Sequence, residues 1–138
     1  MSSIVTFYSY KGGVGRTMAV ANIAILLAQL GLRTLVVDWD LEAPGIERYF
    51  RNWQTKRDGL LTLLTEAAST VNQESKPNWR DYVSIIDKGY KCPLSVITSG
   101  YSSTKNYAQK ILSFDWNSFF KNANGGEYIE SLRNDWLE

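Results

Sequence analysis

At 138 residues, with 44% hydrophobic and 13% aromatic side chains, the chain is long enough to form one compact domain around a buried core. Its 15 basic and 14 acidic residues give a formal net charge of +1. This small charge excludes a global electrostatic attraction to nucleic acid or membranes, and no local sequence signal for either partner is found. The absence of histidine excludes Ser-His triads and the commonest zinc ligands, while the single cysteine, Cys92, and the lack of an apolar leader favour a cytoplasmic setting.

The first 37 residues predict a strand, a helix and a second strand. Residues 4–8 are β-branched and aromatic and run into glycines, which is typical of a strand followed by a loop. Residues 17–30 are apolar on nearly every face and end at Gly31, so a helix covered on more than one side is expected. Residues 34–37 predict a parallel strand that is buried on both faces. A right-handed βαβ unit would place the loops after both strands at one edge of the sheet.

The remaining sequence predicts further helices and one more strand. Helices are expected at residues 59–71 and 126–138, and residues 94–98 predict a third strand that ends at Ser99 and Gly100. The fold class predicted is α/β, with a mostly parallel sheet flanked by helices, of the P-loop NTPase type. All 138 residues are assigned to one such domain, and no second domain is predicted.

The loop before the first helix carries the strongest functional signal. It reads Lys-Gly-Gly-Val-Gly-Arg-Thr over residues 11–17 and lies between a predicted strand and a helix N-terminus. Glycines without side-chain obstruction let backbone amides point at one volume, and a helix N-terminus favours an anion there. The pattern therefore predicts a phosphate-binding loop, and the alternative is a glycine-rich turn that only connects strand and helix.

This loop resembles that of the deviant Walker A ATPases, the ParA and MinD family of the SIMIBI class, whose motif is K-G-G-x-G-K-[ST]. Six of the seven motif positions match, and Arg16 stands where the family has lysine. The resemblance implies that ATP is held by Lys11, Gly12, Gly13, Val14, Gly15, Arg16 and Thr17, and that the Thr17 hydroxyl binds Mg²⁺. It also implies that Lys11 reaches the nucleotide of a partner subunit in a nucleotide-dependent homodimer.

Two aspartates follow the second predicted strand. Asp38 and Asp40 leave the sheet at the edge expected to hold the phosphate loop. The resemblance implies that Asp38 supports the Mg²⁺ shell and that Asp40 orients or deprotonates the attacking water. The alternative is that the Asp-x-Asp pair is only a solvated strand end. Trp39 between them is expected to point away, either into core packing or toward a partner. Residues 41–45 are interpreted as a switch loop.

The sequence also departs from the family pattern. The strand at residues 94–98 lacks the acidic residue that P-loop ATPases use to hold Mg²⁺, so we expect the domain to be incomplete at its C-terminus and to belong to a larger protein. The first functional hypothesis is an ATP-driven dimerization switch with Lys11, Arg16 and Asp40 as catalytic residues, in which the present chain alone is weak or inactive. The second is a nucleotide-binding module without hydrolysis, and the third is a folded remnant that binds no nucleotide. The protein partner, or fused downstream domains, cannot be named from the sequence.

Overall fold

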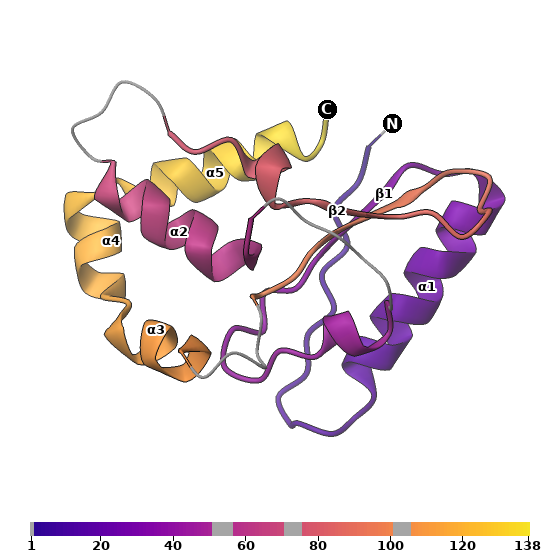
Figure 1. The fold of residues 1–138 in the computed structure, drawn as a ribbon, viewed down its shortest axis with the longest axis horizontal. Helices are drawn as coiled ribbons and strands as arrows, with labels where there is room; N and C mark the ends of the chain where they lie inside the picture. The colour runs from indigo at the N-terminus through magenta and orange to yellow at the C-terminus, as the bar shows by residue number, and fades with distance from the viewer. Residues whose placement is uncertain (1, 51–56, 71–75, 101–105) are drawn as a thin grey trace.

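The computed structural model describes residues 2–50, 57–70, 76–100 and 106–138. Its strands form a small sheet with helices on both sides (Figure 1). In chain order they are α1 (Arg16–Leu30), β1 (Thr34–Val37), η1 (Ile46–Arg48), α2 (Gly59–Ser69), η2 (Trp79–Tyr82), β2 (Ser84–Ile86), β3 (Leu94–Ile97), α3 (Tyr107–Ser113), α4 (Trp116–Asn122) and α5 (Gly125–Asp135). The α/β class predicted from the sequence is confirmed.

The three strands of the described sheet have the order β1-β3-β2. β1 and β3 pair in parallel, from Thr34 opposite Leu94 to Val37 opposite Ile97, and both were predicted from their apolar runs. β2 pairs antiparallel with β3 and was not predicted, because three residues are too few to establish a pattern. The parallel pair sends the chain ends after Val37 and Ile97 to one edge of the sheet, where the candidate site lies.

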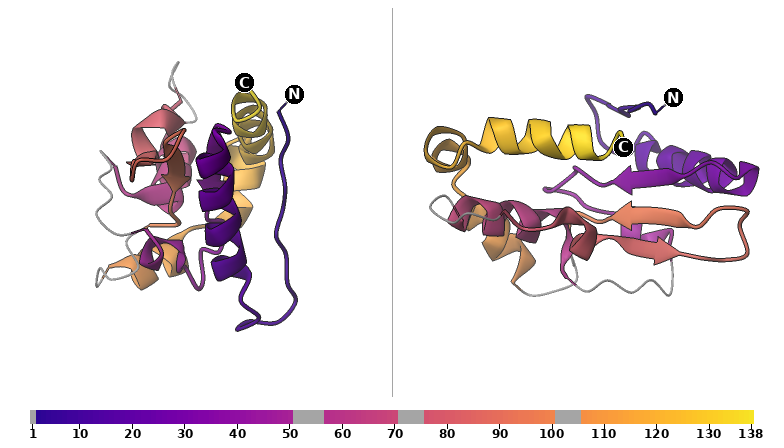
Figure 2. Two further views of the ribbon diagram at one scale, coloured as in Figure 1. Left: turned by 90° about the vertical axis from the view of Figure 1, so that its right-hand side faces the viewer. Right: turned by 90° about the horizontal axis from the view of Figure 1, so that it is seen from above.

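The strand predicted at residues 4–8 is absent from this sheet. In both views of Figure 2 the segment lies on the outer side of α1, apart from the three strands, and Val5 and Tyr8 are exposed. A β-branched and aromatic sequence favours an extended backbone, but a strand also needs a neighbour that offers hydrogen bonds. The prediction of a βαβ unit was therefore wrong for this part of the chain as the structure describes it.

Helix α1 begins and ends as the sequence predicts but is covered on one face only. Its buried residues are Ala21, Ala24 and Ala28, which pack against the sheet beside Val36 and Val96. Larger apolar side chains on the rest of the helix, Met18, Ile23, Leu26 and Leu30, are exposed. The expectation of cover on several sides was wrong, because the fully buried residues are small alanines on one face, with Val20 and Ile25 packed partly buried beside them.

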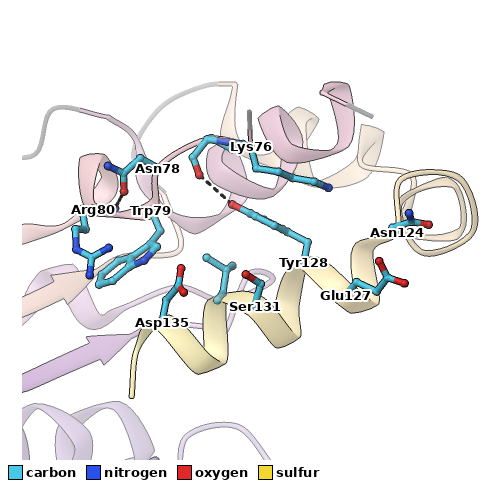
Figure 3. Close-up of a pocket in the computed structure, with 11 residues that line it drawn as sticks. Lys76, Asn78, Trp79, Arg80, Asn124, Glu127, Tyr128, Ser131 and Asp135 are labelled. Atoms are coloured by element: carbon cyan, nitrogen blue, oxygen red, sulfur yellow. Dashed lines mark hydrogen bonds between the residues drawn. The ribbon is translucent and has the colours of Figure 1, made fainter. Parts of the chain in front are cut away.

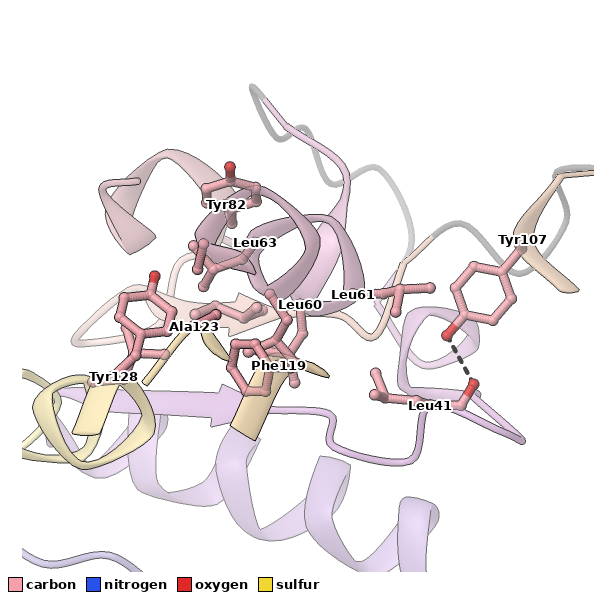
Figure 4. Packing of buried hydrophobic residues seen from close by; sticks show 13 residues of the cluster. Leu41, Leu60, Leu61, Leu63, Tyr82, Tyr107, Phe119, Ala123 and Tyr128 are labelled. Carbon is pink, nitrogen blue, oxygen red and sulfur yellow. Dashed lines mark hydrogen bonds between the residues drawn. The ribbon is translucent and has the colours of Figure 1, made fainter. Parts of the chain in front are cut away.

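A second apolar cluster lies on the other side of the sheet and contains the buried face of α2 (Figure 4). Leu60 and Leu64 of α2 are fully buried there, together with Phe119 of α4 and Leu132 of α5. The helix predicted at the end of the chain is present as α5, and its residues Tyr128 and Leu132 are buried in this cluster. No helix in the described ranges is both long and apolar enough to span a membrane.

The N-terminus of α2 is anchored to the end of β3. The amide of Leu60 donates to the carbonyl of Thr98 at 2.7 Å, and the amide of Leu61 donates to the carbonyl of Ser99 at 3.0 Å. Gly59 has a φ of +31°, and a side chain there would approach the Gly100 amide nitrogen to 2.5 Å. This close approach fixes the chain after β3, which in turn supports the loop after β1.

Candidate nucleotide-binding site

The loop of residues 11–17 presents an open backbone in front of α1. Gly13 and Gly15 have φ values of 74° and 77°, a left-handed conformation that favours glycine. A Cβ built on Gly12 or Gly13 would have no atom within 4 Å. No side chain caps the first turn of α1, which begins at Arg16, so the helix retains the amides that an anion binds.

The cationic side chains of the loop differ in their surroundings. Arg16 turns back across the loop, donating to the Ser9 hydroxyl at 3.0 Å and forming an ion pair with Asp40. Both members of this pair are about one third exposed, with side-chain accessibilities of 28% for Arg16 and 31% for Asp40. Lys11 is exposed, and its carbonyl accepts a hydrogen bond from the Ser9 hydroxyl at 3.1 Å. Arg16 thus connects the loop to the end of β1.

Asp38 organises the chain that follows β1. Its Oδ1 accepts the Asp40 amide at 3.1 Å, and its Oδ2 accepts the amides of Ile46 at 3.2 Å and Gly45 at 3.4 Å. Burial raises the pKa of the Asp38 carboxyl, and these backbone hydrogen bonds only partly oppose that shift. The carboxylate therefore holds residues 40–46 in a closed loop next to the phosphate loop.

Thr17 lies beside the loop that Asp38 holds, since a Cβ built on Gly45 would be 3.9 Å from Thr17 Cγ2. A hydroxyl and a carboxylate are suitable Mg²⁺ donors, and Mg²⁺ usually takes only one or two protein ligands besides water and phosphate oxygens. Within the described residues no group of three or more acidic, histidine or cysteine side chains is placed to hold a metal alone. The oxygen donors of Thr17 and Asp38 are therefore of the type that suits a Mg²⁺ ion arriving with a nucleotide.

Two residues that sequence reasoning did not assign to the site hold its loop in place. The Ser99 hydroxyl donates to the carbonyls of Asp38 at 2.9 Å and Asp40 at 3.2 Å. The Tyr107 hydroxyl donates to the carbonyl of Leu41 at 2.9 Å, and burial raises its pKa to about 12. The position of Ser99 directly after a parallel strand was a usable signal, whereas the α3 residue Tyr107 had none in the sequence.

Trp39 lies in the loop after β1, and its side chain is partly exposed. It lines one hollow of about 360 Å³ together with Asp40, Leu41 and Glu42, and 42% of its surface is exposed. The alternation of side chains expected for a strand ends with β1 at Val37, and the Leu41 amide already donates to the Trp39 carbonyl at 2.9 Å in a tight turn. Trp39 is therefore available for a contact.

Another hollow, of about 410 Å³, lies between η2 and α5 (Figure 3). In Figure 1 the helix α5 and the loop before α1 lie on opposite sides of the molecule. Its walls carry cations, Lys76 and Arg80, as well as acids, Glu127 and Asp135, and the Lys76 ammonium lies 5.1 Å from the centre of the Tyr128 ring. The mixed charges select no class of ligand.

An α/β sheet with a glycine loop before α1 and a carboxylate loop at the same edge defines a nucleotide-binding domain of the P-loop class. The chain matches the CobQ/CobB/MinD/ParA nucleotide binding domain over residues 5–133. The protein therefore belongs to that family, and the resemblance found in the loop sequence is confirmed.

Several curated proteins are similar to parts of the chain. An uncharacterized ATP-binding protein of Methanocaldococcus jannaschii is 35% identical over 91 residues, covering 64% of this chain and 34% of the relative. A cytosolic Fe-S cluster assembly factor of Yarrowia lipolytica is 40% identical over 50 residues, covering 36% of this chain and 17% of the relative. The septum site-determining protein MinD of Escherichia coli is 43% identical over 47 residues, covering 34% of this chain and 17% of the relative.

The chain thus spans about a third or less of the length of these curated relatives. No solved structure gives a significant match to it.

Proposed function

We propose that this chain is the N-terminal part of a P-loop domain that binds Mg²⁺ and ATP and uses the nucleotide to switch dimerization. The observation that supports this best is the uncapped N-terminus of α1 behind the open, left-handed glycine loop. The Arg16–Asp40 ion pair adds a cation and a carboxylate at the edge of the same loop. The single cysteine fits a reducing, cytoplasmic setting for such a switch.

Each residue at the loop has a role in this proposal. The amides of residues 12–17 hold the phosphates, and Lys11 and Arg16 supply positive charge. Thr17 and Asp38 hold Mg²⁺, which when bound neutralises charge on the terminal phosphates. Asp40 orients the attacking water once Arg16 has turned from it to phosphate. The exposed Lys11 is free to extend toward a facing subunit.

Nucleotide binding is tested by titrating an ATP analogue with Mg²⁺ into the wild type and a Gly15→Val variant. The branched side chain strains a left-handed position and disturbs the start of α1, so the affinity should fall at least tenfold. Gly89→Val is the matched control, because Gly89 has a φ of 74° and an open environment but lies outside the loop. Equal affinities of the two variants would contradict the assignment of the phosphate site.

Dimerization is tested by light scattering with ATP on the full-length protein. Lys11→Ala should abolish the nucleotide-dependent dimer and hydrolysis with it, whereas Asp40→Ala should accumulate an ATP-bound dimer that does not turn over. Lys88→Ala serves as a control for the loss of an exposed lysine elsewhere. A Lys11→Ala protein that dimerizes like the wild type would remove the intersubunit role of this lysine.

The second candidate function is a nucleotide-binding module without hydrolysis. It is favoured by Arg16 itself, because the residue that replaces the lysine of the motif is paired with Asp40, the candidate for activating water. Phosphate release in the presence of Mg²⁺ separates the two functions. If hydrolysis is limited by this departure, an Arg16→Lys variant should release phosphate faster, and an unchanged or lower rate would contradict that explanation.

A further inference from the structure

The hollow beside Asp40 is lined by aromatic, aliphatic and acidic residues. Its walls come from the loop after β1, from α2, and from α3, α4 and the turn between them, and among the residues that the structure describes none that lines it is basic. Trp39 and Trp116 line the hollow and are 42% and 38% exposed, and the Trp116 ring stacks on Phe120. Asp40 and Glu42 place carboxylates in the same lining.

Aromatic faces combined with carboxylates are the chemistry that recognises a guanidinium group. A flat arginine side chain stacks on an indole ring while its N–H groups donate to a carboxylate. Nucleic acid is disfavoured here because its phosphates would face two acids and, among the described lining residues, no cation. We propose that this hollow docks a segment of a protein partner through an arginine side chain, and that nucleotide in the phosphate loop strengthens this docking.

Both walls of the hollow are held rigidly, which favours docking because little order has to be imposed on binding. On one side, Ser99 and Tyr107 hold the carbonyls of Asp40 and Leu41, and Figure 4 shows the Tyr107 contact. On the other side, the rings of Phe114 and Trp116 pack edge to face with centroids 4.6 Å apart.

The nucleotide dependence follows from the Arg16–Asp40 ion pair and rests on the function proposed above. Asp40 accepts the Ala43 amide at 3.2 Å with one oxygen and Arg16 with the other, so its charge is compensated by a cation that does not line the hollow. When phosphate competes for Arg16, the carboxylate of Asp40 becomes available to a guanidinium in the hollow. Because coupling between two sites is reciprocal, a bound arginine also strengthens nucleotide binding by the same factor.

The test uses the blocked peptide acetyl-Leu-Arg-Leu-amide as a probe, with tryptophan fluorescence and calorimetry at low ionic strength. The same peptide with citrulline in place of arginine keeps the shape but lacks the charge. We expect the arginine peptide to bind at least threefold more tightly, as the loss of one partly exposed ion pair corresponds to a factor of about three to five. Glu42→Gln and Trp39→Leu should each weaken arginine binding by a similar factor.

Glu127→Gln is the matched control for Glu42→Gln, since it removes an exposed acid that lines the other hollow. It should leave the affinity of the arginine peptide unchanged. Equal binding of the arginine and citrulline peptides, or equal loss in both glutamate variants, would overturn the docking site. An ATP analogue that displaces the arginine peptide would also overturn it, because the hollow would then hold the base of the nucleotide.

The effect of the Arg16–Asp40 ion pair on docking is tested separately from nucleotide binding by an Arg16→Gln variant. This change frees Asp40 without any nucleotide and should tighten arginine binding about threefold. Arg48→Gln, which removes one exposed cation elsewhere, controls for net charge. If the nucleotide does not bind, the proposed function fails while the Arg16→Gln result still decides the docking site. The nucleotide dependence of docking is refuted if bound nucleotide leaves the affinity for the arginine peptide unchanged and Arg16→Gln has the same affinity as Arg48→Gln.

Discussion

The ion pair between Arg16 and Asp40 should stabilise the nucleotide-free protein and lose this effect when nucleotide binds. The two side chains are about one third exposed, so their coupling should lie between that of surface pairs and that of buried pairs. We therefore expect a coupling free energy of about 1 kcal/mol in the absence of ligand. Arg16 also donates to Ser9 at 3.0 Å, a contact that survives the loss of Asp40 and must be separated from the pair.

A double-mutant cycle isolates this coupling. Arg16→Gln, Asp40→Asn and the double variant are unfolded in urea, with and without a saturating ATP analogue and Mg²⁺. The coupling should be present in the free protein, fall with added salt, and drop toward zero with nucleotide because phosphate replaces Asp40 as the partner of Arg16. A coupling near zero in the free protein, or one that nucleotide leaves unchanged, would refute the exchange of partners.

Three further predictions concern the frame around the site. Gly59→Ala should lower the free energy of unfolding by about 2–4 kcal/mol, since its Cβ would meet the Gly100 backbone at 2.5 Å. Gly89→Ala, in open space, should lower it by about 1 kcal/mol, and equal losses in urea unfolding would contradict the close approach at Gly59. Because the pKa of Asp38 is raised in the folded state, its contribution to the free energy of unfolding is largest at acidic pH. The free energy of unfolding of the wild type, relative to Asp38→Asn, should therefore fall as the pH rises from about 3.8, and a relative gain would contradict this sign. Tyr107→Phe should lower the free energy of unfolding in urea by about 1–2 kcal/mol, because the buried hydroxyl donates to the loop after β1. An unchanged free energy of unfolding would show that this hydrogen bond does not support the loop.

The chemistry of the candidate site could be recognised from a few short sequence patterns. Local rules place glycines where the backbone is left-handed, as at Gly13 and Gly15, and end the first helix at Gly31. The apolar runs of β1 and β3 indicate a parallel pair because they lack the alternation of a half-exposed antiparallel strand. These features depend on neighbours in the sequence, so the sequence is sufficient to predict them.

Contacts between distant segments were decided only by the tertiary structure. Residues 4–8 have the sequence of a strand but lack a hydrogen-bonding neighbour in the described sheet, and α1 buries its alanines instead of its larger residues. The turn of Arg16 toward Asp40 and the support of the loop by Tyr107 join residues 24 and 66 positions apart. Sequence periodicity describes which side chains share a face of one element, while the partner of that face depends on how all elements pack together.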